Sequence, residues 1–96
     1  MRVISRRRLR EFWQQYPDAE KPLQAWYKTC EKTDFENFAH LKQFCGTADK
    51  VGKFTVFDIG GDKYRLIATV HYTYRKIYIR AVLTHKEYDR NHWKKE

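Results

Sequence analysis

The chain has 96 residues, 42% hydrophobic and 17% aromatic, which is enough for one small core and too short for two independently packed domains. Twenty Lys and Arg against 12 Asp and Glu give a net charge of +8, which points to a polyanionic partner: RNA, DNA, an anionic membrane surface or an acidic protein. No apolar run is long enough for a membrane helix or follows the basic N-terminus as in a signal peptide, so we expect one cytoplasmic domain over residues 1–96. Cys30 and Cys45 are too few for a disulfide framework and are expected to be free thiols.

The first segment has the pattern of a very short strand followed by a helix. Val3 and Ile4 suit the strand, and Ser5 is a candidate N-cap because its hydroxyl can accept from a free amide of the first turn. Pro17 is expected to end this helix, since the residue before a proline is pushed out of the α region. The apolar stripe at helical spacing consists of Leu9, Phe12, Trp13 and Tyr16.

Two more helices are expected before residue 47. Asp18 is a candidate cap for the second helix, where Pro22 is tolerated because it falls in the first turn. Asn37 is a candidate cap for a short third helix, with Gly46 as its stop. The apolar residues of the two helices are Leu23, Trp26, Tyr27 and Cys30, then Leu41, Phe44 and Cys45.

The second half of the chain has the pattern of three strands, expected over residues 53–59, 63–72 and 75 or 76 to 83. Gly60 and Gly61 predict a hairpin, because the favoured tight turns need positive φ. A second short connection follows Tyr72. The strands therefore form an antiparallel meander, and the segregation of helices from strands predicts an α+β fold with the helices on one face of the sheet.

Alternation along the strands assigns side chains to the two faces of this sheet. The helix-covered face is predicted to carry Tyr64, Leu66, Ala68, Val70 and Tyr72, with Ile77, Ile79, Ala81 and Leu83. The opposite, open face is predicted to carry Arg65, Ile67, Thr69 and His71, with Tyr78, Arg80 and Val82.

Two-residue turns would bring cations together on the open face. In that register Asp58 lies opposite Lys63, and Ile67 lies opposite Arg80. Arg65 is then the diagonal neighbour of Arg80, about 7–8 Å away between backbones. The prediction is a cationic patch of Lys63, Arg65 and Arg80 on a rigid sheet, and it depends on the register.

Residues 84–90 carry the groups best suited to proton transfer. His85 can move protons near neutral pH, and Tyr88 can donate a proton, or accept one where cations lower its pKa. Beside several cations, such groups suit cleavage of a phosphodiester without a metal. A structural interpretation is equally open: Thr84 and Glu87 have the spacing of a capping box at a helix start.

Two long segments resemble the signatures of HigB-type toxins in the RelE-like superfamily. These are Phe57–Ile67, at the predicted hairpin, and Tyr78–Asp89, at the end of the last strand. The N-terminal part is similar as well, over residues 1–5, 9–12, 17–20 and 25–27, so the resemblance covers essentially the whole chain in order.

The resemblance implies a RelE-like fold with the active site on the sheet face away from the helices. Members are toxins of type II toxin–antitoxin pairs that cleave mRNA, typically in the ribosomal A site, and so inhibit translation. The reaction resembles that of metal-independent ribonucleases, in which the 2′-hydroxyl attacks its own 3′ phosphate and leaves a cyclic phosphate. The implied partners are mRNA, the ribosome and a HigA-like helix-turn-helix antitoxin; no cofactor, metal or membrane is implied.

The resemblance also suggests roles for individual residues. Arg65 and Arg80 match basic strand positions and are expected to stabilise the phosphate and the transition state, with help from Lys63. His85 is the candidate general acid or base, and Tyr88 is a second candidate for proton transfer or base stacking.

Three acidic residues complicate this assignment. The family pattern usually has Asn at the positions of Asp58 and Asp62, and an acidic Asp58 would reduce the positive potential if it paired with Lys63 or Arg65. Asp89 either orients one of the proton-transfer groups or completes the helix cap.

Further cations are candidates for RNA contacts: Arg6, Arg7, Lys86 and Arg90. The N-terminal cluster of Arg2, Arg6, Arg7, Arg8 and Arg10 either grips ribosomal RNA phosphates or forms the polar face of the first helix. The tail from Arg90 to Glu96 either extends this basic surface or is disordered.

Two other functions remain open at this stage. A non-catalytic RNA- or DNA-binding module would use the same cations, with Tyr72, Tyr74 and Tyr78 exposed for base stacking. An inactive toxin would serve only as the partner of its antitoxin. The histidines and cysteines show no known metal-ligand spacing.

Overall fold

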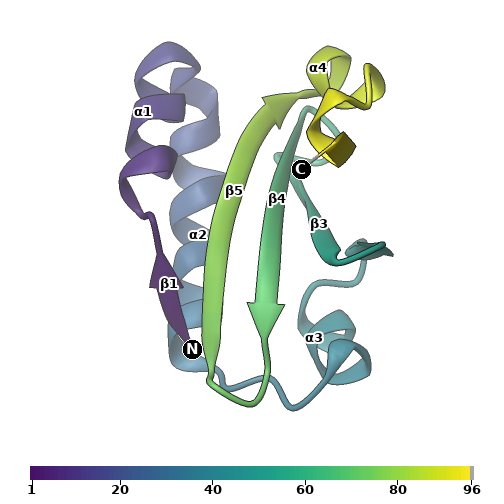
Figure 1. The fold of residues 1–96 in the computed structure, drawn as a ribbon. Helices are drawn as coiled ribbons and strands as arrows, with labels where there is room; N and C mark the ends of the chain where they lie inside the picture. The colour runs from purple at the N-terminus through teal and green to yellow at the C-terminus, as the bar shows by residue number, and fades with distance from the viewer. Residues whose placement is uncertain (96) are drawn as a thin grey trace.

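The computed structural model describes residues 1–95, without the side chain of Lys95. The end of the predicted basic tail, which consists of that side chain and Glu96, lies outside the described residues. Its elements are β1 (Arg2–Ile4), α1 (Arg7–Gln15), η1 (Pro17–Ala19), α2 (Glu20–Lys32), α3 (Phe38–Phe44), β2 (Asp49–Val51), β3 (Phe54–Ile59), β4 (Tyr64–His71), β5 (Lys76–Thr84), α4 (His85–Asp89) and η2 (His92–Lys95). Figure 1 shows α1 and α2 beside and behind the long central strands β4 and β5, with α4 at the end of β5. No helix in the described part of the chain is long and apolar enough to cross a membrane.

The α+β architecture predicted from the sequence is confirmed, but the sheet is larger than a three-stranded meander. Its five strands have the order β1-β5-β4-β3-β2. The predicted N-terminal strand is present as β1 and pairs in parallel with β5, so the sheet is mixed. The strand β2 is not predicted by the sequence pattern, because this three-residue edge strand has exposed Asp49 and Lys50 and lacks apolar alternation.

Of the three helix caps predicted before residue 47, only one is present. Asn37 caps α3 by accepting a hydrogen bond from the His40 amide at 2.8 Å. Ser5 is not a cap: it has φ +73°, and α1 begins after Arg6 without a side-chain cap. Asp18 is not a cap either, because it lies inside η1 and its carboxylate accepts hydrogen bonds from Lys63 and Tyr64.

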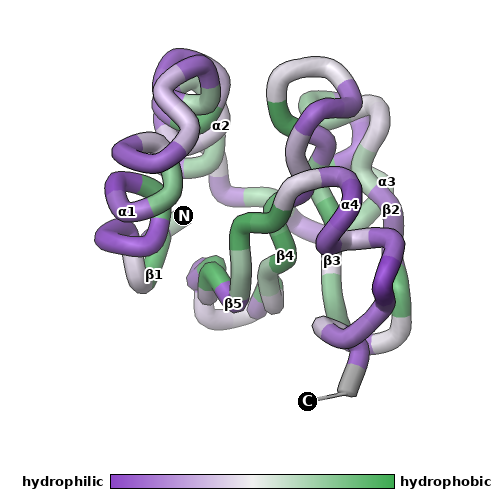
Figure 2. The backbone as a smooth tube through the Cα atoms, turned by 90° about the horizontal axis from the view of Figure 1, so that it is seen from above, coloured by the Kyte–Doolittle hydropathy of each residue, from purple (hydrophilic) through white to green (hydrophobic). Residues whose placement is uncertain are grey.

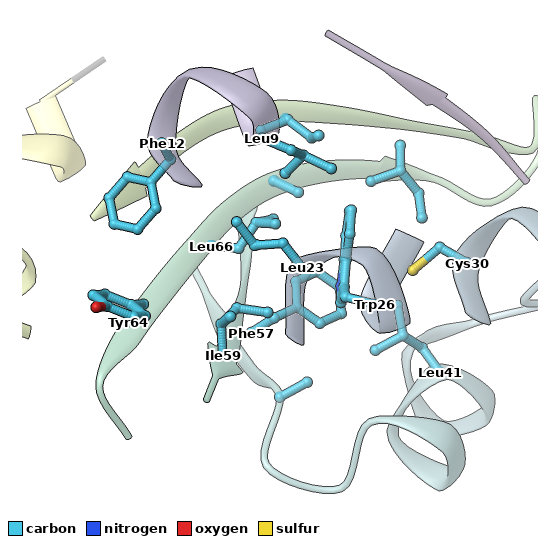
Figure 3. Packing of buried hydrophobic residues seen from close by; sticks show 14 of the residues in the cluster. Leu9, Phe12, Leu23, Trp26, Cys30, Leu41, Phe57, Ile59, Tyr64 and Leu66 are labelled. Carbon is cyan, nitrogen blue, oxygen red and sulfur yellow. The ribbon is translucent and has the colours of Figure 1, made fainter. Parts of the chain in front are cut away.

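The main core lies between the helices and the sheet, as predicted. Figure 3 shows Leu9 and Phe12 of α1 and Leu23 and Trp26 of α2 directed towards Leu66 and neighbouring side chains of the strands. Cys30 is buried and Cys45 half-buried, both as free thiols. Phe44 departs from the prediction, because its place at the end of α3 leaves it 54% exposed.

The hairpin between β3 and β4 has a longer connection than predicted. Gly60 and Gly61 both have positive φ, at 65° and 74°, as the turn chemistry required. The register nevertheless pairs Asp58 with Arg65 rather than with Lys63. A shift of two residues keeps the side chains of β4 on their predicted faces, because the side-chain period is two.

A β-bulge in β5 makes its side chains face differently from the prediction. From His71 to Ala68, strand β4 pairs with β5 in the predicted register, and Ala68 lies opposite Ile79. The next residue, Ile67, pairs with Ala81, so Arg80 is the extra residue of the bulge. The prediction that Ile67 lies opposite Arg80 is therefore wrong. The bulge reverses the alternation, so Ala81 and Leu83 join the open face while Val82 packs against the helix-side core.

This reversal creates a second apolar cluster on the open face. Phe54, Val56 and Ile67 form its buried centre. The partly buried residues that pack against them are Val51, Ala81, Leu83, Tyr88 and Trp93. In Figure 2 the hydrophobic segments follow β4 and β5, while α1 is largely hydrophilic. The segment after β5 therefore packs, through Tyr88 and Trp93, on the second apolar cluster, to which the bulge adds Ala81 and Leu83.

Candidate functional site

The candidate site begins at the junction of β5 and α4, where the predicted capping box is present. The Thr84 hydroxyl accepts from the Glu87 amide at 3.2 Å, and the Glu87 carboxylate accepts from the Thr84 amide at 2.9 Å. The His85 amide also donates to the Lys63 carbonyl at 3.1 Å, which ties α4 to the β3–β4 turn. The capping interpretation of residues 84–90 is therefore confirmed, and the capped helix carries His85 and Tyr88 at the end of the sheet.

Arg65 lies beneath this helix and is held from several sides. Its Nε pairs with Asp58 Oδ1 at 3.1 Å, and its Nη1 donates to the carbonyls of Asp62 and Tyr64 at 2.8 and 3.2 Å. The ring of Tyr88 lies 5.4 Å from the guanidinium, and the Arg65 side chain is only 12% exposed. Arg65 is thus rigid, largely covered and partly neutralised by Asp58.

Tyr88 forms the middle layer of a stack between Arg65 and Trp93. The Tyr88 and Trp93 rings lie 5.0 Å apart and nearly parallel, and Trp93 Nε1 donates to the Tyr88 carbonyl at 3.0 Å. Burial raises the pKa of the Tyr88 phenol, although the nearby Arg65 charge opposes the shift. Tyr88 therefore keeps its proton at neutral pH, which suits a proton donor and not a base.

His85 stands at the outer side of α4 and is oriented by Asp89. Its Nδ1 lies 3.0 Å from Asp89 Oδ2, one helical turn away, and both side chains are at least half exposed. This contact is the one through which Asp89 would orient the imidazole. When Nδ1 carries the proton shared with Asp89, Nε2 is directed to accept or donate a second proton.

Arg80 projects from the bulge on the open face, in the middle of β5. Its Nε donates to Thr69 Oγ1 at 3.1 Å, and its guanidinium lies 5.6 Å from the Tyr78 ring. Arg65 lies opposite Leu83, and the Ile67–Ala81 pair separates it from the bulge. The predicted diagonal contact between Arg65 and Arg80 is therefore wrong: the structure places them at two positions along one face.

Lys63 does not belong to the open face. The longer turn takes it out of the strand, and its Nζ pairs with Asp18 Oδ2 at 3.2 Å on the helix side of the sheet. The other oxygen of Asp18 accepts a 2.5 Å hydrogen bond from the Tyr64 hydroxyl. Lys63 thus takes part in a clamp between η1 and β4, which corrects its predicted place in the cationic patch.

The remaining candidate cations are spread over the surface. Arg6 lies 4.3 Å from the Tyr27 ring of α2, and Arg7 is 3.7 Å from Glu11. Lys86 is exposed on α4, and Arg90 is exposed directly after it. The four candidates therefore lie in two groups, one on the helix layer and one beside α4.

The sequence did not indicate the places of Trp93 and Arg8, although Arg8 was named within the N-terminal arginine cluster. Trp93 covers Tyr88, and its only sequence signal was a large aromatic residue within a charged tail. Arg8 donates from Nη1 to the Arg80 carbonyl at 3.0 Å, a contact that no local pattern could indicate. Among the tyrosines offered for base stacking, Tyr74 is exposed but Tyr72 packs against the helix-side core, so the three do not form one exposed platform.

The α+β fold agrees with the family that comparison of the sequence shows. Residues 19–91 match the family HigB_toxin, the RelE-like toxic component of a toxin-antitoxin system, and the chain belongs to this family. It is 35% identical over 92 residues to the mRNA interferase toxin HigB of Escherichia coli K12, covering 93% of this chain and 88% of that relative. The same figures hold for the mRNA interferase HigB of Shigella flexneri. The mRNA interferase HigB of Escherichia coli O6:H1 is 26% identical over 93 residues, covering 94% of this chain and 90% of that relative.

Proposed function

We propose that this chain is an mRNA interferase: an endoribonuclease that cleaves mRNA on the ribosome and so inhibits translation. Membership of the toxin family and the names of its relatives support the reaction class. The observation that carries the assignment to residues is the end of the sheet, where α4 carries His85 and places Tyr88 over Arg65, with Arg80 further along the same face. The net charge of +8 suits a nucleic acid substrate.

The proposed reaction is an internal transfer of the phosphodiester. The substrate 2′-oxygen forms a bond to phosphorus, the bond from phosphorus to the 5′-oxygen breaks, and the products are a 2′,3′-cyclic phosphate and a 5′-hydroxyl. His85 accepts the 2′-hydroxyl proton at Nε2, since Asp89 holds its Nδ1. Tyr88, whose raised pKa keeps its proton in place, supplies the proton to the leaving 5′-oxygen.

The two arginines have different tasks in this proposal. Arg80 is exposed and presents its guanidinium to the phosphate, where a planar fork of donors matches two phosphate oxygens. Arg65 is largely covered, so it acts through the field at the site and through its contact with Tyr88. Arg6, Arg7, Lys86 and Arg90 supply further phosphate contacts to RNA. The partners are mRNA, the ribosome and an antitoxin of the HigA-like helix-turn-helix kind.

A primer-extension map of one messenger in a reconstituted translation system tests the proposal. Wild-type protein is compared with His85→Ala and with His71→Ala, which removes an exposed histidine from the far end of the same face. We expect ribosome-dependent cuts within the reading frame that fade about 10²–10⁴-fold in His85→Ala and persist in His71→Ala.

Each other outcome has a definite meaning. Cuts of equal strength in His85→Ala would keep the enzyme but remove His85 from its mechanism. Cuts that do not need ribosomes would keep the ribonuclease and remove the ribosome from the proposal. Absence of cuts, with binding to RNA or ribosomes intact, would favour a non-catalytic binding module or an inactive toxin that only pairs with its antitoxin.

A further inference from the structure

The edge of β5 that faces β1 has a strand neighbour only along the first part of its length. β1 ends at Ile4, opposite Tyr78, so the part of β5 that begins at Ile79 extends past it. Figure 1 shows α1 beside this part of β5. An edge carbonyl here needs a partner from outside the sheet or from water.

The bulge lies in this uncovered part of the edge. Arg80 is the residue without a Cα partner in β4, and its carbonyl accepts a hydrogen bond from Arg8 Nη1 at 3.0 Å. Arg8 lies in the first turn of α1, which packs against β5. The hydrogen bond therefore joins a helix to the backbone of the bulged residue.

The arginines beside Arg8 make different contacts. Arg6 leans over the Tyr27 ring at 4.3 Å, and Arg7 faces Glu11 of its own helix at 3.7 Å. Arg10 is exposed on the same helix. These neighbours carry the same charge as Arg8 but form no hydrogen bond to Arg80. A comparison of Arg8 with them therefore distinguishes a role of Arg8 in positioning Arg80 from a purely electrostatic role.

Arg80 is held at its other end as well. Its Nε donates to Thr69 Oγ1 at 3.1 Å, from the strand on the opposite side of the bulge. This bond uses the Nε–H and leaves the Nη donors for a two-point contact with phosphate. The backbone of Arg80 is thus anchored by α1 and its side chain by β4.

We propose that Arg8 is a positioning residue that holds the β5 bulge and so aims the Arg80 guanidinium, with Thr69 as the second anchor. The inference rests on the proposed function, in which Arg80 contacts the scissile phosphate. A bulge bends its strand and re-aims the residue that it carries. Fixing both ends of Arg80 before RNA binds reduces the conformational entropy lost in the transition state.

The test compares Arg8→Gln with Arg10→Gln in the full chain, by steady-state cleavage of ribosome-bound mRNA. Arg8→Gln is expected to lower kcat about 5- to 100-fold with little change in KM, because misplacing one group costs rate more than binding. Arg10→Gln removes the same charge and is expected to act on KM. Arg8→Lys, which keeps a donor of the same charge, is expected to restore part of kcat. Equal effects of Arg8→Gln and Arg10→Gln would overturn the proposal.

A double-mutant cycle links Arg8 to Arg80. Arg80→Gln alone is expected to lower kcat about 10²–10³-fold, and adding Arg8→Gln to it is expected to cost nothing more. Additive losses would overturn the positioning role. If Arg80→Gln leaves cleavage unchanged, the role of Arg80 in the proposed function fails instead.

An NMR measurement separates the two failures and does not need activity. The ¹⁵Nε resonance of Arg80 is expected to shift in Arg8→Gln and in Thr69→Val but not in Arg10→Gln. An unchanged resonance in a folded Arg8→Gln variant would show that Arg8 does not hold Arg80, whatever the enzyme does.

Discussion

The ion pair between Asp58 and Arg65 combines two opposing effects at one position. Asp58 holds the Arg65 guanidinium at 3.1 Å beneath Tyr88, which fixes its place. The same carboxylate cancels much of the charge that Arg65 would offer to a phosphate. The resemblance to the family had raised this question from the acidic residue alone, and the register that pairs Asp58 with Arg65 answers it.

Asp58→Asn tests which effect is larger. The amide can still bond to Arg65 without cancelling its charge, so we expect RNA affinity to rise roughly 3-fold at low salt and the gain to fade at high salt. The free energy of unfolding is expected to fall by about 1–3 kcal/mol, because a mostly covered ion pair is lost. RNA titrations at several salt concentrations and urea unfolding measure the two quantities.

Asp62→Asn is the matched control for this prediction. It removes the same charge from an exposed turn residue whose backbone carbonyl, and not its carboxylate, contacts Arg65. The control is expected to show a smaller gain in affinity and little loss of stability. A fall in RNA affinity for Asp58→Asn would mean that orientation of Arg65 matters more than its free charge.

At the scale of elements, a local capping box fixes the start of α4, and contacts between residues distant in the sequence join the helix layer to the sheet. The capping box starts α4 directly at the end of β5, so the helix that carries His85 and Tyr88 has a defined direction. The Asp18 carboxylate joins η1 to β4 through the Tyr64 hydroxyl at 2.5 Å and the Lys63 ammonium at 3.2 Å. This clamp keeps the β3–β4 turn, to which α4 is bonded, against the helix layer.

The clamp predicts that the stability of the fold depends on pH in both the acidic and the alkaline range. The Tyr64 and Lys63 bonds hold the pKa of Asp18 below its ordinary value, so its stabilisation is present above about pH 4 and is lost as the pH falls further. The Asp18 bond raises the pKa of Tyr64 to about 12 from 10.0. That stabilisation is present below pH 10 and is lost as the pH rises towards 12.

Urea unfolding across the pH range measures both limbs. Tyr64→Phe keeps the ring packed against Phe12 and Tyr16 but has no phenol, so its stability should fall less than that of wild type above pH 10. Asp18→Asn should lose less stability than wild type in acid. Parallel curves for wild type and both variants would show that the clamp does not contribute to folding.

At the scale of the whole molecule, the cations considered for RNA contacts form two groups. One group of cations lies along α1, and another lies beside α4 with Lys86 and Arg90. Phosphate contacts release counterions, so RNA affinity should fall linearly with salt on logarithmic axes. The slope reports how many cations meet phosphates.

Arg7→Gln distinguishes the two interpretations of the N-terminal arginines. If Arg7 meets RNA phosphate, the salt slope should become shallower by about one. Arg7→Lys, which keeps the charge, is expected to leave the slope near that of wild type. Affinities for ribosomes and for RNA, measured between low and moderate salt, provide the test; an unchanged slope for Arg7→Gln would make Arg7 part of the polar face of α1.

Local chemistry in the sequence was sufficient for much of this molecule. The Asn37 cap, the Thr84–Glu87 capping box and the positive φ at Gly60 and Gly61 all depend on residues within a few positions of one another. Alternation of period two assigned the faces of β4 correctly, and it survived a register error of two residues. The two family signatures, Phe57–Ile67 and Tyr78–Asp89, contain the glycine turn and the capping box.

The remaining features depend on contacts between residues distant in the chain. Strand pairing inserts Arg80 as a bulge, and the reversal sends Ala81 and Leu83 to the open face, where Trp93 covers them. Lys63 turns to Asp18 across 45 positions, and Arg8 reaches Arg80 across 72. Register, bulges and edge contacts are chosen by the packing of several elements at once, so a local pattern predicts which groups carry the chemistry, and only the assembled fold determines where they point.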